Sequence, residues 1–350
     1  SAIVGPCSAR ESEHVLGFAV VGLGYWGPNL VRNLAALPDV ELRLAADIDP
    51  ERCAAIRRAY PQLNTVSSIE DVLADKQCDA VAIATPVETH YALARAALLA
   101  GKHVLVEKPL ATDVSQAEEL VRLAEDRHRV LMVDHVYVYS NPVRLLRTLI
   151  DRGELGELQF IDSVRVNLGL FQRAVNVVWD LAPHDLSIID YLIDRMPETV
   201  GLLAAAHTHG GHEDVGYLSL DFGNGLIANI HVNWLSPVKV RYFMIGGSKK
   251  SVIYNDLKRA EAVKIYDSGI SLRQDDAEGR RRMLIDYRTG DVLSPHIPHI
   301  EPLAQMCRHF VECIRKDQQP LTDGLAGLRV VRILDAAHRS RKAGGARIRP

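Results

Sequence analysis

The sequence lacks several features that would assign it to a large class of proteins. No apolar run in its 350 residues approaches the length of a membrane-spanning helix. The formal net charge is only −3, and no stripe of arginine and lysine is interleaved with aromatic residues, so nucleic-acid binding is not expected. There is no internal repeat and no low-complexity segment. With 47% hydrophobic and 24% charged residues, the composition is that of an ordinary globular protein, and the length predicts two domains.

Disulfide pairing and metal ligation are also poorly supported. The number of cysteines is odd, and no C-x-x-C pair occurs among Cys7, Cys53, Cys78, Cys307 and Cys313. The histidines within 207–212 and 296–309 follow no standard zinc spacing. We therefore predict a reduced, cytoplasmic protein without a metal. Residues 1–14 have no basic start followed by a long apolar stretch, so a disordered tail is expected rather than a signal peptide.

The most informative motif is the string VVGLGYWGPNL at residues 20–30. Its glycines Gly22, Gly24 and Gly27 form the pattern G-x-G-x-x-G between a short apolar run and a helix expected over 28–37. The first glycine permits a tight turn, the second lets a pyrophosphate approach the backbone, and the third lets the helix pack on the strand. The helix N-terminus adds free N–H groups. The motif predicts dinucleotide binding; a glycine-rich turn that only packs a βαβ unit is the alternative.

Asp47 supports the same interpretation. It lies twenty positions beyond Gly27, at the end of the apolar run Val40–Asp47. A carboxylate in that place accepts hydrogen bonds from the adenosine ribose. It favours NAD, because it would repel the 2′-phosphate of NADP. Arg52 lies near enough in the sequence to leave some use of NADP open.

Short apolar runs alternate with helical segments from residue 17 to residue 135. Asp113 is placed to cap the last helix, and Gly101 to end the one before it. The alternation predicts an α/β Rossmann domain, which is a doubly wound sheet with ligands at the carboxyl ends of its strands. The strands are expected at Phe18–Val21, Val40–Asp47, Asp79–Pro86, His103–Pro109 and Val130–Val133.

The pattern changes after about Tyr139, where strand-like runs become consecutive and Asn224-Gly225 is a strong hairpin signal. This predicts an α+β domain with an open, mainly antiparallel sheet. The chain then divides into a tail at 1–14, an NAD-binding Rossmann domain at 15–138, and a substrate-binding and oligomerisation domain at 139–350. The strand-like runs of this part are Glu157–Asn167, Thr199–Ala206, Tyr217–Phe222, Leu226–Trp234, Val240–Ile245 and Ser251–Tyr254, and its helices are Asn141–Asp151, Leu181–Asp194, Glu301–Ile314 and Gly324–Arg341.

Two turns at strand ends are candidate parts of the site. Thr85 and Pro86 follow one strand, and Glu107-Lys108-Pro109 ends the next. A lysine there would lie beside a nicotinamide, where it can move a proton or hold a substrate hydroxyl. The alternatives are a plain strand-ending turn and a surface lysine.

The string WDLAPHD at 179–185 carries a third candidate. In a helix from about Asp180, this aspartate and His184 are four positions apart and share one face. Such a pair can anchor a substrate and act as general acid and base. Alternatively, Asp180 is an acid near the helix dipole and His184 is an interior histidine.

The strings GLGYWG, EKP and D-x-x-x-H occur in this order and at the separations that resemble the glucose–fructose oxidoreductase, inositol dehydrogenase and rhizopine catabolism (Gfo/Idh/MocA) family. The resemblance implies catalytic roles for Lys108 and His184 and a substrate-binding role for Asp180. It also implies that the second domain covers the active site and builds a dimer or tetramer. Cofactor contacts are expected at Gly22, Gly24, Tyr25, Trp26, Gly27, Asp47, Thr85, Pro86, Glu107 and Lys108.

Within the family, the strings GYWGPNLVRN, RVNLGLFQ and HVNWLSPVKVR with GGSKK look like a narrower group. That group includes nucleotide-sugar 3-dehydrogenases of polysaccharide and amino-sugar pathways. Substrate contacts from Arg165, Asn167, Tyr139 and Asn141 are expected on this basis, with structural hydrogen bonding as the alternative. Ala174 stands where this group would have an acid.

The resemblance predicts an NAD-dependent oxidation of a ring hydroxyl of a sugar, with His184 or Lys108 as the base. A nucleotide sugar oxidised at C3 is the expected substrate. The alternatives are an inositol or free-sugar dehydrogenase, a glycosidase that uses tightly held NAD, and a regulator that binds a dinucleotide without turnover. We expect a homo-oligomer formed through the antiparallel strands.

Overall fold

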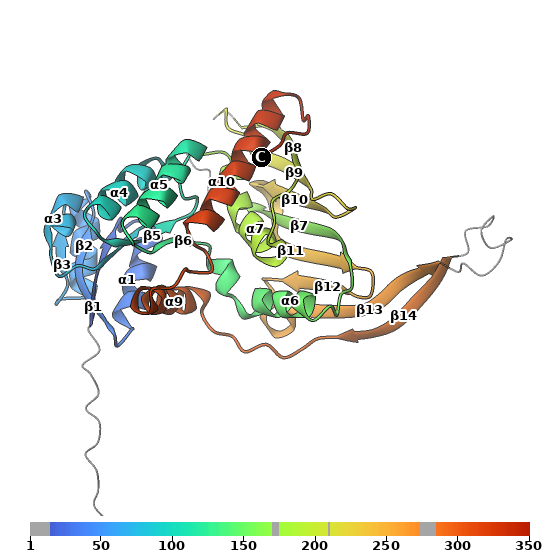
Figure 1. Cartoon of the computed structure of the whole chain (residues 1–350), viewed down its shortest axis with the longest axis horizontal. Helices are drawn as coiled ribbons and strands as arrows, with labels where there is room; N and C mark the ends of the chain where they lie inside the picture. The colour runs from blue at the N-terminus through green and yellow to red at the C-terminus, as the bar shows by residue number, and fades with distance from the viewer. Residues whose placement is uncertain (1–14, 170–174, 209–210, 273–284) are drawn as a thin grey trace, which may run out of the picture.

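The computed structural model describes residues 15–169, 175–208, 211–272 and 285–350 (Figure 1). The expected tail at 1–14 and the position of Ala174 lie outside these residues. Two sheets organise the described chain, and helices cover them (Figure 1). No described helix has the length and apolarity needed to cross a membrane.

The first sheet has six strands in the order β3-β2-β1-β4-β5-β6, and every pair is parallel. The order reverses between β1 and β4, which is the point where ligands bind in doubly wound sheets. The expected Rossmann domain is confirmed. The strands are β1 Leu16–Val21, β2 Val40–Ala46, β3 Asn64–Val66, β4 Ala80–Ile83, β5 His103–Glu107 and β6 Leu131–Asp134.

The helices around the first sheet begin and end at residues that suit helix ends. The Asp113 carboxylate accepts from the N–H groups of Ser115 and Gln116, as predicted for the cap of α5. Gly101 has φ +76° after α4, as expected for a residue that ends a helix. Strand β3 and helix α3 were not predicted, since both are too short to show a period. The helices are α1 Gly27–Ala35, α2 Pro50–Ala59, α3 Ile69–Ala74, α4 Val87–Leu99 and α5 Val114–Asp126.

The second sheet has eight described strands in the order β14-β13-β12-β11-β7-β10-β9-β8. It is mainly antiparallel, as predicted, but β7 and β10 pair in parallel. This differs from a fully antiparallel arrangement because the chain leaves β7, passes through a helix and returns to the sheet as β8, with β10 and β9 lying between β7 and β8. The strands are β7 Leu158–Leu168, β8 Thr199–Ala205, β9 Val215–Asp221, β10 Ile227–Asn233, β11 Leu235–Gly247, β12 Ser251–Asn255, β13 Val263–Leu272 and β14 Ile285–Leu293.

Helix α7 differs from its predicted bounds. It begins at Val177, because the Asn176 side chain caps the N–H groups of Val178 and Trp179. It also continues through Pro183, a residue that usually interrupts a helix. Asp180 therefore lies in the first turn and His184 one turn later. The remaining helices are η1 Val136–Tyr139, α6 Asn141–Asp151, α7 Val177–Ile193, η2 Arg259–Glu261, α9 Pro302–Lys316 and α10 Gly324–Lys342.

The C-terminal helices return to the first sheet (Figure 1). The Phe310 ring of α9 meets the Phe18 ring of β1 edge-on, with 5.8 Å between centroids. Residues of α9 thus share a core with β1 and α1. A domain boundary near residue 138 stays a proposal, and α9 lies beyond it in sequence but packs on the first sheet.

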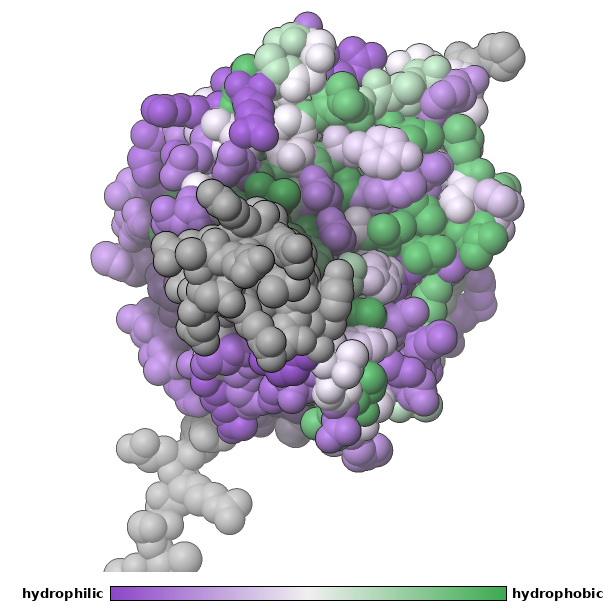
Figure 2. Space-filling model, turned by 90° about the vertical axis from the view of Figure 1, so that its right-hand side faces the viewer, coloured by the Kyte–Doolittle hydropathy of each residue, from purple (hydrophilic) through white to green (hydrophobic). Residues whose placement is uncertain are grey.

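One face of the second sheet is left open by the helices. Side chains from neighbouring strands line up across it, including Leu203, Tyr217 and His231, which are in register. The Tyr217 and His231 rings stack with centroids 4.3 Å apart, and Leu203 is 65% exposed. Hydrophobic residues gather on the right-hand part of the view in Figure 2, toward this side of the molecule.

Candidate active site

The glycine turn has the geometry that its sequence predicts. Gly22 has φ +94°, and a Cβ there would lie 2.5 Å from the carbonyl oxygen of Ala84. A Cβ on Gly27 would lie 1.9 Å from the carbonyl oxygen of Gly22. A Cβ on Gly24 would meet only Arg52, at 3.6 Å. The outer glycines are therefore needed for packing, whereas Gly24 leaves its backbone open to a ligand.

Asp47 holds this turn from the end of β2. Its carboxylate accepts from Leu23 N at 2.6 Å and from Asp49 N at 2.8 Å. The Arg52 guanidinium lies 3.5 Å from the same carboxylate and is half-exposed. A cation therefore lies beside the acid that was expected to face the ribose, as the position of Arg52 in the sequence suggested.

A cavity of about 900 Å³, which we name the cofactor cavity, runs along the carboxyl edge of the first sheet. Tyr25 and Ile48 stand at its wall with 89% and 91% of their surface exposed. Such apolar exposure suits the faces of a bound aromatic ring. Every expected cofactor contact except Gly27 lines this cavity, namely Gly22, Gly24, Tyr25, Trp26, Asp47, Thr85, Pro86, Glu107 and Lys108.

Sequence reasoning missed several residues of this cavity. Ile48 follows Asp47 directly but carries no motif, and residues 67–70 come from the segment between β3 and α3 and from the start of α3. His90 is buried and its ring contacts the carbonyl oxygens of Thr85 at 2.9 Å and Pro109 at 2.8 Å. It thereby ties together the two strand-ending turns that the sequence did predict. Burial lowers the pKa of His90.

Lys108 and Asp180, which are 72 positions apart, meet at one end of the cofactor cavity. Lys108 Nζ donates to the Asp180 carbonyl at 2.7 Å and lies 3.3 Å from its carboxylate. The other carboxylate oxygen accepts from the Trp234 indole at 3.3 Å. The lysine is thus not a surface residue, since its side chain is 16% exposed.

Pro183 removes one hydrogen bond from the first turns of α7. Proline has no N–H for the carbonyl four positions earlier, and its ring pushes against that turn. The first turns of α7 are therefore not fully bonded within the helix. The carbonyl that Pro183 leaves without a helical donor is that of Trp179, and the Asp180 carbonyl, one position later, accepts from Lys108.

His184 lies one turn beyond Asp180 on α7. Its ring meets the Tyr137 ring edge-on with centroids 5.2 Å apart, and its Nδ1 is buried with no hydrogen-bond partner among the described residues. Burial, together with the positive charges of Lys108 and Arg165, holds the pKa of His184 well below its usual value. The imidazole is therefore neutral at physiological pH and can accept a proton.

The structure places Arg165 in a buried hydrogen-bond network, the alternative that was given for it, and its substrate contact stays a prediction. The guanidinium is buried and binds both carboxylate oxygens of Asp185, at 2.7 and 3.1 Å. It also donates to the Tyr137 hydroxyl at 3.2 Å and lies over its ring. Arg165 therefore positions the ring on which His184 packs.

Tyr139 is likewise part of the interior. It is fully buried, and its hydroxyl lies 3.3 Å from that of Thr322, which matches the structural hydrogen bonding given as the alternative to a substrate contact. The 3-10 helix η1 turns its side chain into the core, whereas Tyr137 two positions earlier lines a cavity. Asn141 binds the Pro298 carbonyl at 2.7 Å on the wall of a second cavity. Asn167 donates to the neighbouring Leu168 carbonyl and lines none of the cavities described here.

Glu107 and Asp134 form a buried acid pair behind Lys108. They are partners in register on β5 and β6. Burial, and the nearby Asp134, raise the pKa of Glu107 well above its usual value. Asp134 in turn accepts from the Trp26 indole at 2.9 Å. The pair therefore links the glycine turn to the strand that carries Lys108.

The second cavity, of about 610 Å³, adjoins the cofactor cavity. Trp26 lines both, and Tyr137 lines the second cavity while its ring contacts His184. Arg241 lies on the wall and donates to the Tyr137 hydroxyl and to Asp256, at 2.9 Å each. A long substrate with its reacting end near His184 would extend into this space.

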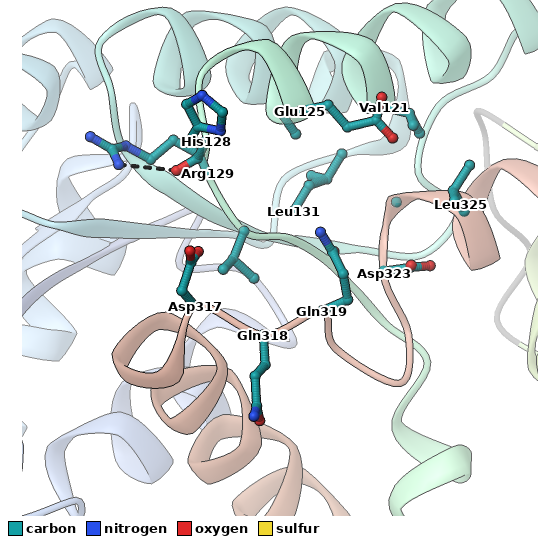
Figure 3. Close-up of a pocket in the computed structure, with 13 residues that line it drawn as sticks. Val121, Glu125, His128, Arg129, Leu131, Asp317, Gln318, Gln319, Asp323 and Leu325 are labelled. Atoms are coloured by element: carbon teal, nitrogen blue, oxygen red, sulfur yellow. Dashed lines mark hydrogen bonds between the residues drawn. The ribbon is translucent and has the colours of Figure 1, made fainter.

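A cavity of about 470 Å³ beside His128 is not part of the site (Figure 3). It lies between α5, the segment after α9 and the start of β6, at the amino end of that strand. Ligands of such sheets bind at the opposite edge. No group of acidic, histidine or cysteine residues in the described chain could hold a metal ion.

The comparisons with known proteins cover both sheets. Residues 16–135 match the oxidoreductase family model GFO_IDH_MocA with its NAD-binding Rossmann fold, and residues 143–253 match the GFO/IDH/MocA C-terminal domain. The chain is 27% identical to a UDP-N-acetylglucosamine 3-dehydrogenase from Acidithiobacillus ferrooxidans, over 89% of this chain and 93% of that protein. It is 24% identical to a 2,7-anhydro-N-acetylneuraminate hydratase from Escherichia coli strain K12, over 93% and 95%.

A solved structure shows the same fold. It is the WlbA dehydrogenase from Bordetella pertussis, in complex with NADH and UDP-GlcNAcA. The TM-score is 0.80 with 22% sequence identity, over 97% of this chain and 99% of that one.

Proposed function

Since this chain belongs to the Gfo/Idh/MocA family of oxidoreductases and binds NAD through its Rossmann fold, we propose that it oxidises a ring hydroxyl of a nucleotide-linked sugar, at C3, to a ketone. One observation carries the proposal. Lys108 contacts Asp180 at 2.7 Å at the end of the cofactor cavity, and a neutral His184 follows one helical turn later. A cation from the end of β5 and a carboxylate and a proton acceptor from α7 thus converge on one place.

The residues divide the chemistry as follows. The Asp180 carboxylate accepts a hydrogen bond from a sugar hydroxyl and orients the ring. His184 accepts the proton of the reacting hydroxyl, and Lys108 donates to the oxygen as negative charge develops on it. The chemistry that NAD supplies when bound is the acceptance of a hydride from the carbon that bears this hydroxyl. Gly22, Gly24, Asp47 and the start of α1 would hold it.

The positive surroundings of His184 matter for turnover. Lys108, Arg165 and Arg241 disfavour the imidazolium, so a proton received from the substrate is released again readily. The unpartnered Nδ1 gives the charged form no compensating carboxylate. His184 is therefore neutral before the reaction and can accept a proton, while the same positive charges make it a weaker base than a free imidazole.

A second candidate is a reaction in which NAD is reduced and reoxidised within one turnover, as in a glycosidase or a hydratase. The similarity to a 2,7-anhydro-N-acetylneuraminate hydratase is the observation that supports this second candidate. Both candidates use the same proton acceptor. Only the dehydrogenase accumulates NADH in proportion to product.

The test is a screen for NAD reduction with UDP-sugars, free sugars and inositols. We expect NADH with a UDP-sugar, and a stoichiometric ketone. An inositol or a free sugar that is oxidised far better would replace the nucleotide sugar in the proposal. Conversion of substrate with no net NADH would favour the second candidate.

We also propose that the open face of the second sheet forms a homo-oligomer. Its exposed apolar residues, such as Leu203 and Tyr217, support this, because a contiguous apolar face usually meets a partner. Light scattering should give a dimer or tetramer at micromolar concentration. Leu203→Glu should lower that mass, whereas a wild-type monomer would contradict the proposal.

A further inference from the structure

The second cavity carries more cationic side chains than the proposed oxidation requires. Lys239, Arg241 and Arg259 all line it. Lys239 and Arg259 are exposed, and neither has an ion-pair partner among the described residues. Such free cations at the wall of a cavity favour an anionic occupant.

The acidic residues of the cavity are already neutralised. Asp256 lies 2.9 Å from Arg241 and accepts from the Tyr254 hydroxyl. Glu301 is paired with Arg32 of α1. After these pairs are set aside, the charges of Lys239 and Arg259 remain uncompensated.

Backbone groups add to the same field. The first turns of α1, α6 and α9 all reach the cavity, through Asn29, Pro142 and Leu303. The N-terminal end of a helix carries partial positive charge. No acidic residue occurs in the first turn of any of these three helices.

The remaining wall suits a planar base and a sugar. Trp26 and Tyr137 present aromatic rings, and Ile297 and Ile300 present apolar side chains from the segment before α9. Aromatic faces stack on nucleobases without selecting one strongly. The volume of about 610 Å³ is within the range of ligand cavities.

From these features we infer that the second cavity binds the nucleoside diphosphate of the substrate, with Lys239 and Arg259 as phosphate contacts and specificity residues. The inference rests on the proposed function for its geometry. With the reacting ring held at Lys108 and His184, the substituent passes Tyr137 and enters the cavity. Arg241 stands at this passage, between Tyr137 and Asp256.

The test compares Lys239→Ala/Arg259→Ala with Lys258→Ala. Lys258 is exposed beside Arg259 but does not line the cavity, so it is the matched control. Because both phosphate contacts are charge-assisted, we expect the double variant to raise the KM for UDP-N-acetylglucosamine about tenfold or more. Its kcat should stay within about twofold of wild type, and its KM for NAD should not change, since neither residue touches the cofactor cavity.

Direct binding of UDP separates this inference from the proposed function. UDP should bind the wild-type protein, compete with the nucleotide sugar but not with NAD, and bind the double variant about tenfold more weakly. Uridine without phosphates should bind far more weakly than UDP. If UDP-sugars are oxidised while the double variant keeps wild-type KM and UDP affinity, the inference is wrong and the function stands. If UDP binds as described but no UDP-sugar is oxidised, the site stands and the function is wrong.

Discussion

The two ends of the site are built in different ways. The cofactor end is one continuous turn, in which Gly22, Gly24 and Gly27 act within a few residues of one another. The catalytic end is assembled from β5 and α7, which meet through Lys108 and Asp180, 72 positions apart. The geometry of a local turn changes little when residues elsewhere in the chain are substituted. The geometry of the catalytic end depends on every element that positions its residues. The two ends should therefore respond differently to substitution.

The largest effects are expected at the catalytic end. Lys108→Ala and His184→Ala should each lower turnover about 10²-fold or more, the usual scale for loss of a general acid or base. Binding of NAD should persist, because neither residue touches the glycine turn. Steady-state kinetics and NAD titration check this, with Lys76→Ala and His212→Ala as exposed controls. Loss of NAD binding in both variants would make the residues structural instead.

At the cofactor end, two adjacent glycines should behave differently. Gly24→Ala should weaken NAD binding about tenfold or more with an unchanged melting temperature, since its Cβ meets only Arg52 in the free protein. Gly22→Ala should weaken NAD binding and also lower the melting temperature, because its Cβ would lie 2.5 Å from a carbonyl oxygen and its φ is +94°. Equal melting temperatures in the two variants would contradict this account, in which the turn itself fixes the conformation and the space at each glycine.

Asp47 should set the choice of cofactor. Asp47→Ser removes the carboxylate beside the ribose. Arg52, whose guanidinium lies 3.5 Å from that carboxylate in the wild-type protein, is then free to bind a 2′-phosphate. We expect the preference for NAD over NADP to narrow about tenfold, which is about 1.4 kcal/mol. Asp49→Ser, which also frees Arg52 from a carboxylate, is the control. A wild-type protein that already prefers NADP tenfold would contradict the role of Asp47.

His135 offers a smaller test of the assembled end. It is buried with no partner for either ring nitrogen among the described residues, and burial lowers its pKa to about 3. Because the unfolded chain takes up a proton near pH 6.5 and the folded chain does not, stability is lost as pH falls below that value. His135→Gln should reduce the slope of unfolding free energy against pH by about 1.4 kcal/mol per unit between about pH 6 and about pH 4. His212→Gln should leave the slope unchanged in urea titrations.

The same contrast explains what the sequence could predict. The strand, glycine turn and helix of β1 and α1 are local, so their spacing alone predicted them. Strand ends and helical spacing made Lys108, Asp180 and His184 candidates, but only the resemblance combined them in one site, since no local pattern brings β5 to α7. The pairing of Arg165 with Asp185 was not predicted, because the sequence of a strand does not reveal that a helix residue 20 positions away binds its guanidinium. The second cavity was not predicted as a whole, although the quoted string HVNWLSPVKVR contains Lys239 and Arg241 and Asn141 was expected to contact substrate, because no local pattern brings β11, η2 and α6 together.

The most direct measurement uses UDP-N-acetylglucosamine with deuterium at C3, incubated with NAD and the wild-type protein. Our account predicts that the deuterium leaves the sugar and is recovered in the reduced nicotinamide, in an amount equal to the 3-keto product. It also predicts that Lys108→Ala and His184→Ala slow this transfer about 10²-fold while still binding NAD. Reduced nicotinamide without deuterium, or altered sugar with no net reduction of NAD, would contradict the account.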